Sequence, residues 1–144
     1  MPTHPDRSHL GNAAEVRAAS LLEQAGFTVL ARNYRCRAGE LDIIARRARM
    51  LVIAEVRLRT GAAFGGAAAS ITAAKRARIV RATRYLLRCQ PALAALDVRF
   101  DALLLGAPDG PIEWIEGAFE AGLARTRLFD HGQFRAPCVR RGRR

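Results

Sequence analysis

The sequence predicts one mixed α/β domain whose elements follow in the order αβββαββ. The chain has 144 residues, which is the usual size of a single domain. Half of its residues are hydrophobic and 26% are charged, a balance that supports a buried core and excludes a disordered chain. Two stretches with helical spacing of apolar residues are separated by runs typical of strands, which defines the class.

The first half of the chain predicts one helix and three strands. Between residues 11 and 25 apolar side chains recur at helical spacing, Asn12 can cap the start of the helix, and Gly26 ends it. The three strands that follow are predicted at residues 27–34, 40–46 and 51–59.

The second half predicts a helix and two strands. A loop of small residues at 60–69 precedes an amphipathic helix at 70–88, and Pro91 stops this helix. The last two strands, separated by a turn at residues 108–111, are predicted at residues 98–105 and 112–115.

Positive charge is concentrated at the end of the chain. The net charge is +11, from 24 basic and 13 acidic side chains, and every basic residue except Lys75 is arginine. Seven arginines and Asp130 give residues 125–144 a net charge of +6. The prediction is a flexible N-terminus at 1–10, a domain at 11–122, and a basic, disordered tail at 123–144. The tail indicates a polyanionic partner, and the alternative is a solvated extension that aids solubility.

Several classes of protein are excluded by what the sequence lacks. No apolar run reaches the ~18–20 residues of a membrane span, and the first residues do not form a secretory signal. Three scattered cysteines form no Cys-x-x-Cys pair, which indicates a reducing compartment and argues against a zinc site or a disulfide scaffold. The expectation is a soluble cytoplasmic protein that does not bind membranes.

The second and third strands bring acidic side chains together. A turn centred between Ala48 and Arg49 pairs residue i with residue 97 − i, so that Asp42 faces Glu55 and Glu40 faces Arg57. A shift of one residue would place Asp42 and Glu55 on opposite faces. Nearer the turn Ile44 lies against Ile53, and the other face is apolar: Leu41, Ile43, Ala45, Val52, Ala54, Val56 and Leu58.

Two carboxylates side by side repel each other unless a cation lies between them. Hard divalent ions such as Mg²⁺ take oxygen ligands of this kind and can activate a water for attack on a phosphate. The alternative is a structural charge cluster in which Arg57 and Arg59 balance the acids.

Other residues have simpler interpretations. Phe100 and Trp114 are predicted to be core residues, and Arg99 is predicted to pair with Asp101 on one strand face. The loop at 61–66 lacks a phosphate-binding signature and is predicted to be a mobile flap beside the acids. Four arginines fall on one side of the second predicted helix: Arg78, Arg81, Arg84 and Arg88. This side can bind the phosphates of a nucleic-acid backbone, and the alternative is that it is simply the solvated face of the helix.

The two central strands resemble those of a known family. Residues 39–45 (GELDIIA) and 51–59 (LVIAEVRLR) are similar to the central block of the YraN-like family of uncharacterised bacterial proteins. The resemblance covers roughly residues 11–120, and other matching positions lie on both sides of the block: Gly11, Glu15, Ala18, Gly26, Phe27, Arg32, Asn33, Tyr34, Phe64, Gly65, Lys75, Arg99, Phe100, Asp101, Ala118 and Phe119.

That family is similar to the PD-(D/E)xK nuclease superfamily, in a branch resembling Holliday-junction resolvases. The resemblance implies a restriction-endonuclease-like fold in which Asp42 and Glu55 are metal ligands, with the Val56 carbonyl as a possible third and Glu15 as an added acid. The catalytic lysine of the superfamily falls on Arg57. Arginine does not give up its proton, but it can stabilise charge on a phosphate. Lys75 is the one basic residue that stays lysine, which indicates a requirement there.

The leading hypothesis is a nuclease-like protein that uses Mg²⁺ or Mn²⁺ to hydrolyse phosphodiester bonds in DNA or RNA. Asp42 and Glu55 hold the metal, Glu15 assists, and Arg57 contacts the scissile phosphate. The nucleic-acid contacts are assigned to Arg59, Lys75, Arg78 and Arg81. One alternative is a nucleic-acid-binding protein of the same fold without catalysis, and another is a basic protein that docks on ribosomes or on a protein partner.

Overall fold

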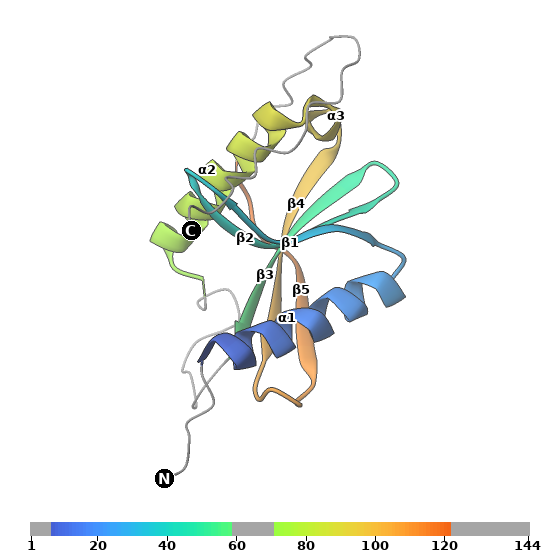
Figure 1. The fold of residues 1–144 in the computed structure, drawn as a ribbon. Coiled ribbons are helices and arrows are strands. Elements are labelled where there is room, and N and C mark those ends of the chain that lie inside the picture. Colours follow the sequence, from blue (N-terminus) through green and yellow to red (C-terminus); the bar gives the residue numbers. More distant parts are fainter. Residues whose placement is uncertain (1–6, 59–70, 122–144) are drawn as a thin grey trace, which may run out of the picture.

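Five strands form one sheet, and helices lie against both of its faces (Figure 1). The computed structural model describes residues 7–58 and 71–121. The elements in chain order are α1 (Arg7–Gln24), β1 (Thr28–Cys36), β2 (Gly39–Arg47), β3 (Met50–Leu58), α2 (Ala73–Cys89), α3 (Pro91–Ala94), β4 (Asp97–Leu105) and β5 (Ile112–Phe119). The predicted mixed α/β class, a central mixed sheet flanked by helices, is therefore confirmed.

The strands lie in the sheet in the same order as in the chain, β1-β2-β3-β4-β5. Three neighbouring pairs are antiparallel, whereas β3 and β4 are parallel. Parallel neighbours need a long connection across a face of the sheet, and α2 lies in this connection. The carboxyl end of β3 and the start of α2 are consequently brought to the same end of the sheet.

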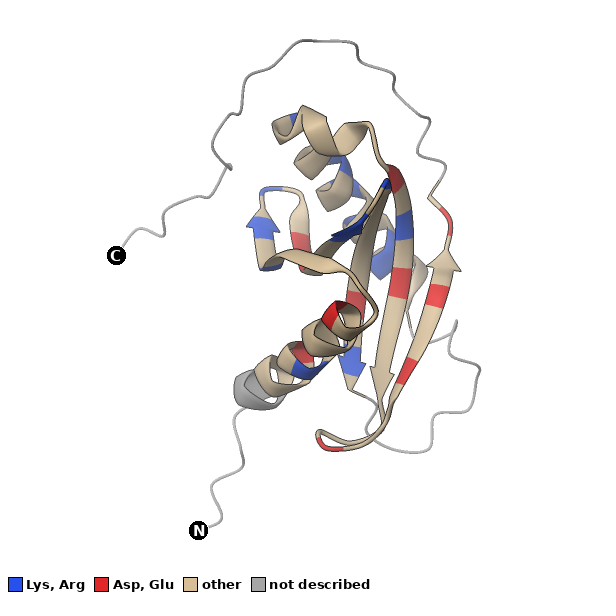
Figure 2. Ribbon diagram, turned by 90° about the vertical axis from the view of Figure 1, so that its right-hand side faces the viewer, with Lys and Arg blue, Asp and Glu red and all other residues tan. Residues whose placement is uncertain are grey.

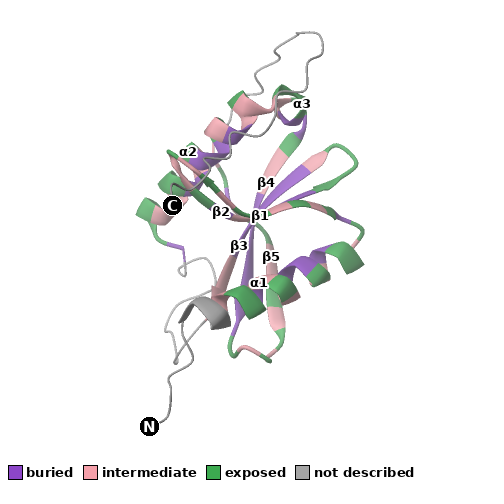
Figure 3. Cartoon of the chain, in the orientation of Figure 1, coloured by how far each residue is buried: buried purple, intermediate pink, exposed green. Residues whose placement is uncertain are grey.

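Two apolar clusters hold the layers together. Figure 3 shows that buried residues lie on the strands and on the helices that cover them. On one face, Ala18 and Leu22 of α1 pack with alternate residues of the central strands, such as Ile43 and Val52. On the other face, Ile79 and Leu86 of α2 pack with Ile44, Ile53 and Phe100. Both faces of β3 are buried because helices cover both sides, which explains its almost unbroken apolar sequence.

Several element boundaries differ from those predicted. Helix α1 begins at Arg7, so Asn12 lies inside the helix and does not cap it. Pro91 ends α2 as predicted but also begins the short helix α3, since a proline at the first position lacks only an N–H that the helix does not use. Strand β5 continues past Ile115 to Phe119. The predicted loop at 60–69, Arg59 and the tail at 123–144 lie outside the described residues.

Leu41 was predicted on the face that carries Ile43, but it packs in the cluster of α2. The β2–β3 ladder begins only at Ile43, so the preceding residues of β2 pair with β1 alone. This part of the hairpin rests on α2, where a Cβ at Gly39 would be 3.4 Å from the carbonyl oxygen of Arg78. Leu41 is fully buried there, in the apolar cluster that α2 covers.

A buried carboxylate joins β4 to β5. Asp101 is fully buried, and both of its oxygens accept hydrogen bonds from the Arg99 guanidinium at 2.8 Å. The Trp114 indole N–H and the Gly117 backbone N–H also donate to it, at 2.9 and 3.0 Å. The predicted Arg99–Asp101 pair is therefore present, and four donors compensate for the burial of its charge.

Among the described residues, no helix has the length and apolar character that crossing a membrane requires.

Candidate metal and phosphate site

The site lies where β2 and β3 separate. Their ladder has the predicted register, with Ile43 opposite Ala54 and Ile44 opposite Ile53, and it ends at the first of these pairs. Strand β3 stays paired with β4 for four further residues, to Leu58. Beyond the last β2–β3 pair, the next residues are Asp42 on β2 and Glu55 on β3. They lie where the two strands begin to separate.

Asp42 closes the end of the ladder with its side chain. Its Oδ2 atom accepts a hydrogen bond of 2.9 Å from the backbone N–H of Val56. A carboxylate thus takes the place of a backbone carbonyl at this N–H, which fixes the Asp42 side chain against β3. The side chains of Asp42 and Glu55 are within hydrogen-bonding contact of each other. The predicted convergence of the two acids is confirmed.

Glu55 is held in an environment that disfavours its charge. The residue is only 4% exposed, and burial is the largest cause that raises its pKa, to about 7. The negative charge of Asp42 raises the pKa further, whereas Lys75 acts in the opposite direction. Near neutral pH the pair therefore holds a proton part of the time, and a cation placed between the two carboxylates would displace it.

Lys75 supplies the positive charge beside the acids. Its Nζ atom is 3.0 Å from Oε1 of Glu55. The Thr72 side chain caps α2 by accepting from the backbone N–H of Lys75, so the first turn of the helix is fixed where it meets the end of β3. Lys75 stands out in the sequence as the single lysine, and it was predicted to contact nucleic acid. In the structure it pairs with Glu55.

Glu15 lies on α1 at the edge of this group. Burial raises its pKa, Asp42 and Glu40 add to the increase, and a hydrogen bond with Asn33 opposes it. Within ranges 7–58 and 71–121, no three His, Cys, Asp or Glu side chains gather closely enough to hold a metal ion by themselves. Glu15 is therefore an outer member of the acidic group, and Asp42 and Glu55 are its inner pair.

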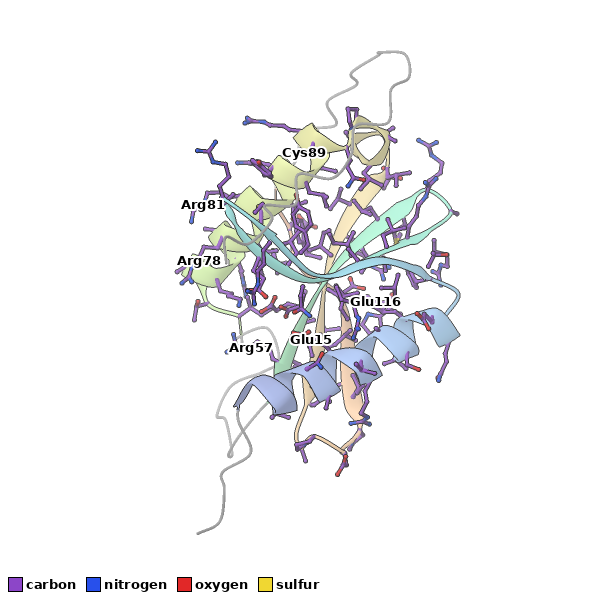
Figure 4. The ribbon with its side chains drawn as sticks, viewed as in Figure 1. Glu15, Arg57, Arg78, Arg81, Cys89 and Glu116 are labelled. Atoms are coloured by element: carbon purple, nitrogen blue, oxygen red, sulfur yellow. The ribbon has the colours of Figure 1, made fainter. Side chains whose placement is uncertain are left out.

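Arg57 and Glu40 do not form the facing pair that the register predicted. Glu40 lies opposite Arg35 of β1, with an ion-pair distance of 3.5 Å between Arg35 Nε and Glu40 Oε1. The prediction is wrong because the β2–β3 ladder stops before these positions. Arg57 lies near the carboxyl end of β3 and is half-buried (Figure 4).

The predicted arginines of α2 are exposed. Arg78 and Arg81 project from the helix away from the sheet (Figure 4), and Ile79 and Ala82 face the core, as the periodicity predicted. Arg59, also predicted to contact nucleic acid, lies outside the described residues.

Fold and site together define a mixed α/β protein with an acidic pair and a lysine at the end of a central strand, beside a basic helix. Residues 14–105 match the model of the uncharacterised protein family UPF0102, and the chain belongs to this family. This is the YraN-like family that the sequence motifs resemble.

Relatives of similar length support the assignment. A UPF0102 protein of Saccharophagus degradans is 49% identical over 109 residues, which are 76% of this chain and 91% of the relative. The UPF0102 protein NE0711 of Nitrosomonas europaea is 47% identical over 112 residues, covering 76% and 92% of the two chains. One from Azorhizobium caulinodans is 51% identical over 110 residues, covering 76% and 82%. These names give the family and state no activity.

Proposed function

We propose that this protein is a nuclease-like enzyme that hydrolyses phosphodiester bonds in nucleic acid with the help of Mg²⁺ or Mn²⁺. The observation that carries the proposal is the contact between Asp42 and Glu55 beside the ammonium group of Lys75. The site faces a basic helix, which suits a polyanionic substrate.

The residues present fit a divalent cation. Two carboxylates in contact, one of them with a pKa near 7, form a donor set that gains from a doubly charged ion. Mg²⁺ is commonly bound by one or two carboxylates and completed by water and substrate phosphates, so a third protein carboxylate is not required. Asp42 and Glu55 would hold the ion, which would supply Lewis acidity and neutralise charge on the phosphate.

The other residues have roles that follow from their positions. Lys75 holds Glu55 in place and presents a positive charge at the site, which suits stabilisation of a phosphate whose charge increases during displacement. The hydrogen bond from Val56 orients Asp42. Arg57 contributes phosphate binding from the same strand end, because a planar guanidinium group matches the geometry of phosphate oxygens.

The test is cleavage of branched, single-stranded and duplex substrates by the full chain in Mg²⁺ or Mn²⁺. The double variant Asp42→Ala/Glu55→Ala is expected to lose cleavage by on the order of 10³-fold, because it removes both metal ligands. The control Glu113→Ala/Glu120→Ala removes two exposed acids elsewhere on the molecule, so it is expected to retain activity. Equal activity of the two double variants would refute the assigned site.

Two single substitutions in the same assay distinguish the role of Lys75 from that of Arg57. Lys75→Met is expected to reduce cleavage more than Arg57→Met, because Lys75 contacts Glu55. Arg57→Lys tests the alternative of a binding protein that has lost catalysis, since it restores the lysine of the resembled superfamily. Cleavage by Arg57→Lys together with none by the natural sequence would favour that alternative.

A further inference from the structure

Helix α2 carries an unbalanced positive charge. Its 17 residues include Lys75 and five arginines but no acidic residue. Four of the arginines are exposed, and from Arg78 to Arg88 they cover about 15 Å of the helix at 1.5 Å per residue. Residues three and four apart are neighbours on a helix surface, so these like charges repel one another and no acidic residue of α2 offsets them.

The β1–β2 hairpin carries two further arginines at its end near α2. Its tip packs on α2, where a Cβ at Gly39 would lie 3.4 Å from the carbonyl oxygen of Arg78 and 3.7 Å from Cβ of Ala82. Arg35 and Arg37 lie at this tip and are exposed, and Arg35 keeps a side-chain exposure of 77% despite its ion pair with Glu40. We give the name basic ridge to the exposed arginines of α2 and of this hairpin end: Arg35, Arg37, Arg78, Arg81, Arg84 and Arg88.

Opposite charges gather elsewhere on the molecule (Figure 2). Strand β5 carries Glu113 and Glu116 and no basic residue. A polyanion is therefore attracted to the side of α2 and repelled from the β5 edge, which gives its approach a direction.

The chemistry of the basic ridge favours contact with phosphates over contact with bases. Proteins that bind single strands usually present aromatic side chains on which bases stack. Over the stretches that the structure describes, every aromatic residue is buried or half-buried, and none is exposed. Arginines at helical spacing suit the regular backbone of a duplex.

We infer that double-stranded nucleic acid lies along the basic ridge, bound through its phosphates by α2 and by the β1–β2 hairpin arginines Arg35 and Arg37. The inference rests on the proposed function for its assignment of nucleic acid as the partner, and it names the class of substrate. Lys75, in the first turn of α2, places the acidic pair at one end of the bound duplex segment.

The test is binding of the full chain to fluorescent duplex DNA and duplex RNA of about 20 base pairs, and to oligo(dT) of equal length, without divalent metal. The natural sequence is expected to bind a duplex more tightly than oligo(dT). Arg35→Ala/Arg37→Ala is expected to weaken duplex binding about tenfold and to reduce the slope of log affinity against log salt by about 1.8, the value for two lost phosphate contacts.

The matched control is Arg46→Ala/Arg49→Ala. It also removes two exposed arginines, each bonded to a backbone carbonyl, from the turn at the opposite end of β2. It is expected to change duplex affinity less than threefold. Equal losses in the two double variants, or tighter binding of oligo(dT) than of either duplex, would overturn the inference. If binding follows the expected pattern but no substrate is cleaved, the hydrolytic proposal fails and the inference stands.

Discussion

Replacing Asp101 with alanine is expected to destabilise the folded domain by about 3–5 kcal/mol. Asp101 is fully buried between β4 and β5 and accepts hydrogen bonds from Arg99, Trp114 and Gly117. Its removal leaves the Arg99 guanidinium, only 21% exposed, without its main counterion, and leaves two N–H groups without an acceptor. A loss of this size is a large part of the total stability of a domain.

Urea denaturation of the natural sequence and of Asp101→Ala measures this effect. The control Glu116→Ala removes the exposed end of the same network, where Glu116 lies 3.5 Å from Arg99 at 58% exposure. It is expected to cost less than about 1 kcal/mol, as exposed ion pairs do. A loss below about 1 kcal/mol for Asp101→Ala as well would show that the buried network does not hold β5 in place.

Replacing Glu55 with glutamine is expected to remove a pH dependence of stability worth about 3 kcal/mol. The pKa of Glu55 is about 7 in the folded protein and near 4.5 when unfolded, because burial and the Asp42 charge outweigh Lys75. Between these two values the folded state holds a proton that the unfolded state releases. The contribution of Glu55 to stability is therefore full below about pH 4.5 and is lost as the pH rises through 7.

The measurement is the free energy of unfolding at several pH values between 5 and 8 without divalent metal. The natural sequence is expected to lose stability across this range relative to Glu55→Gln, whose side chain stays neutral. Glu113→Gln, which changes an exposed carboxylate on β5, is expected to follow the natural sequence. Parallel profiles for all three proteins would contradict the buried, proton-sharing state of Glu55.

The strand register could be predicted because local features specify it. Alternating apolar residues on both strands and a turn between Ala48 and Arg49 leave one register that buries Ile44 against Ile53, and Asp42 and Glu55 follow from it. The end of the ladder could not be predicted in this way. It depends on the Asp42 side chain bonding to Val56 and on β1 and α2 holding the start of β2, which are contacts of the folded chain.

The ion pair between Glu55 and Lys75 could not be predicted from neighbouring residues in the sequence, for the same reason. Arg57 lies two residues away in sequence, whereas Lys75 reaches Glu55 only because α2 returns across the sheet. The length of β5 shows a similar limit. Glu116 and Gly117 interrupt a strand pattern, yet the strand continues because the Gly117 N–H bonds to Asp101 of β4. Composition did give one signal for Lys75, which is the single lysine among 24 basic residues.

Calorimetric titration with Mn²⁺ at pH 7 tests directly whether Asp42 and Glu55 hold a divalent cation, on which the proposed hydrolysis depends. The natural sequence is expected to bind at a single saturable site and to release about half a proton, since Glu55 has a pKa of about 7 and must ionise to bind. Asp42→Asn/Glu55→Gln is expected to show neither binding nor proton release. No saturable binding by the natural sequence, or equal binding by the double variant, would contradict the account.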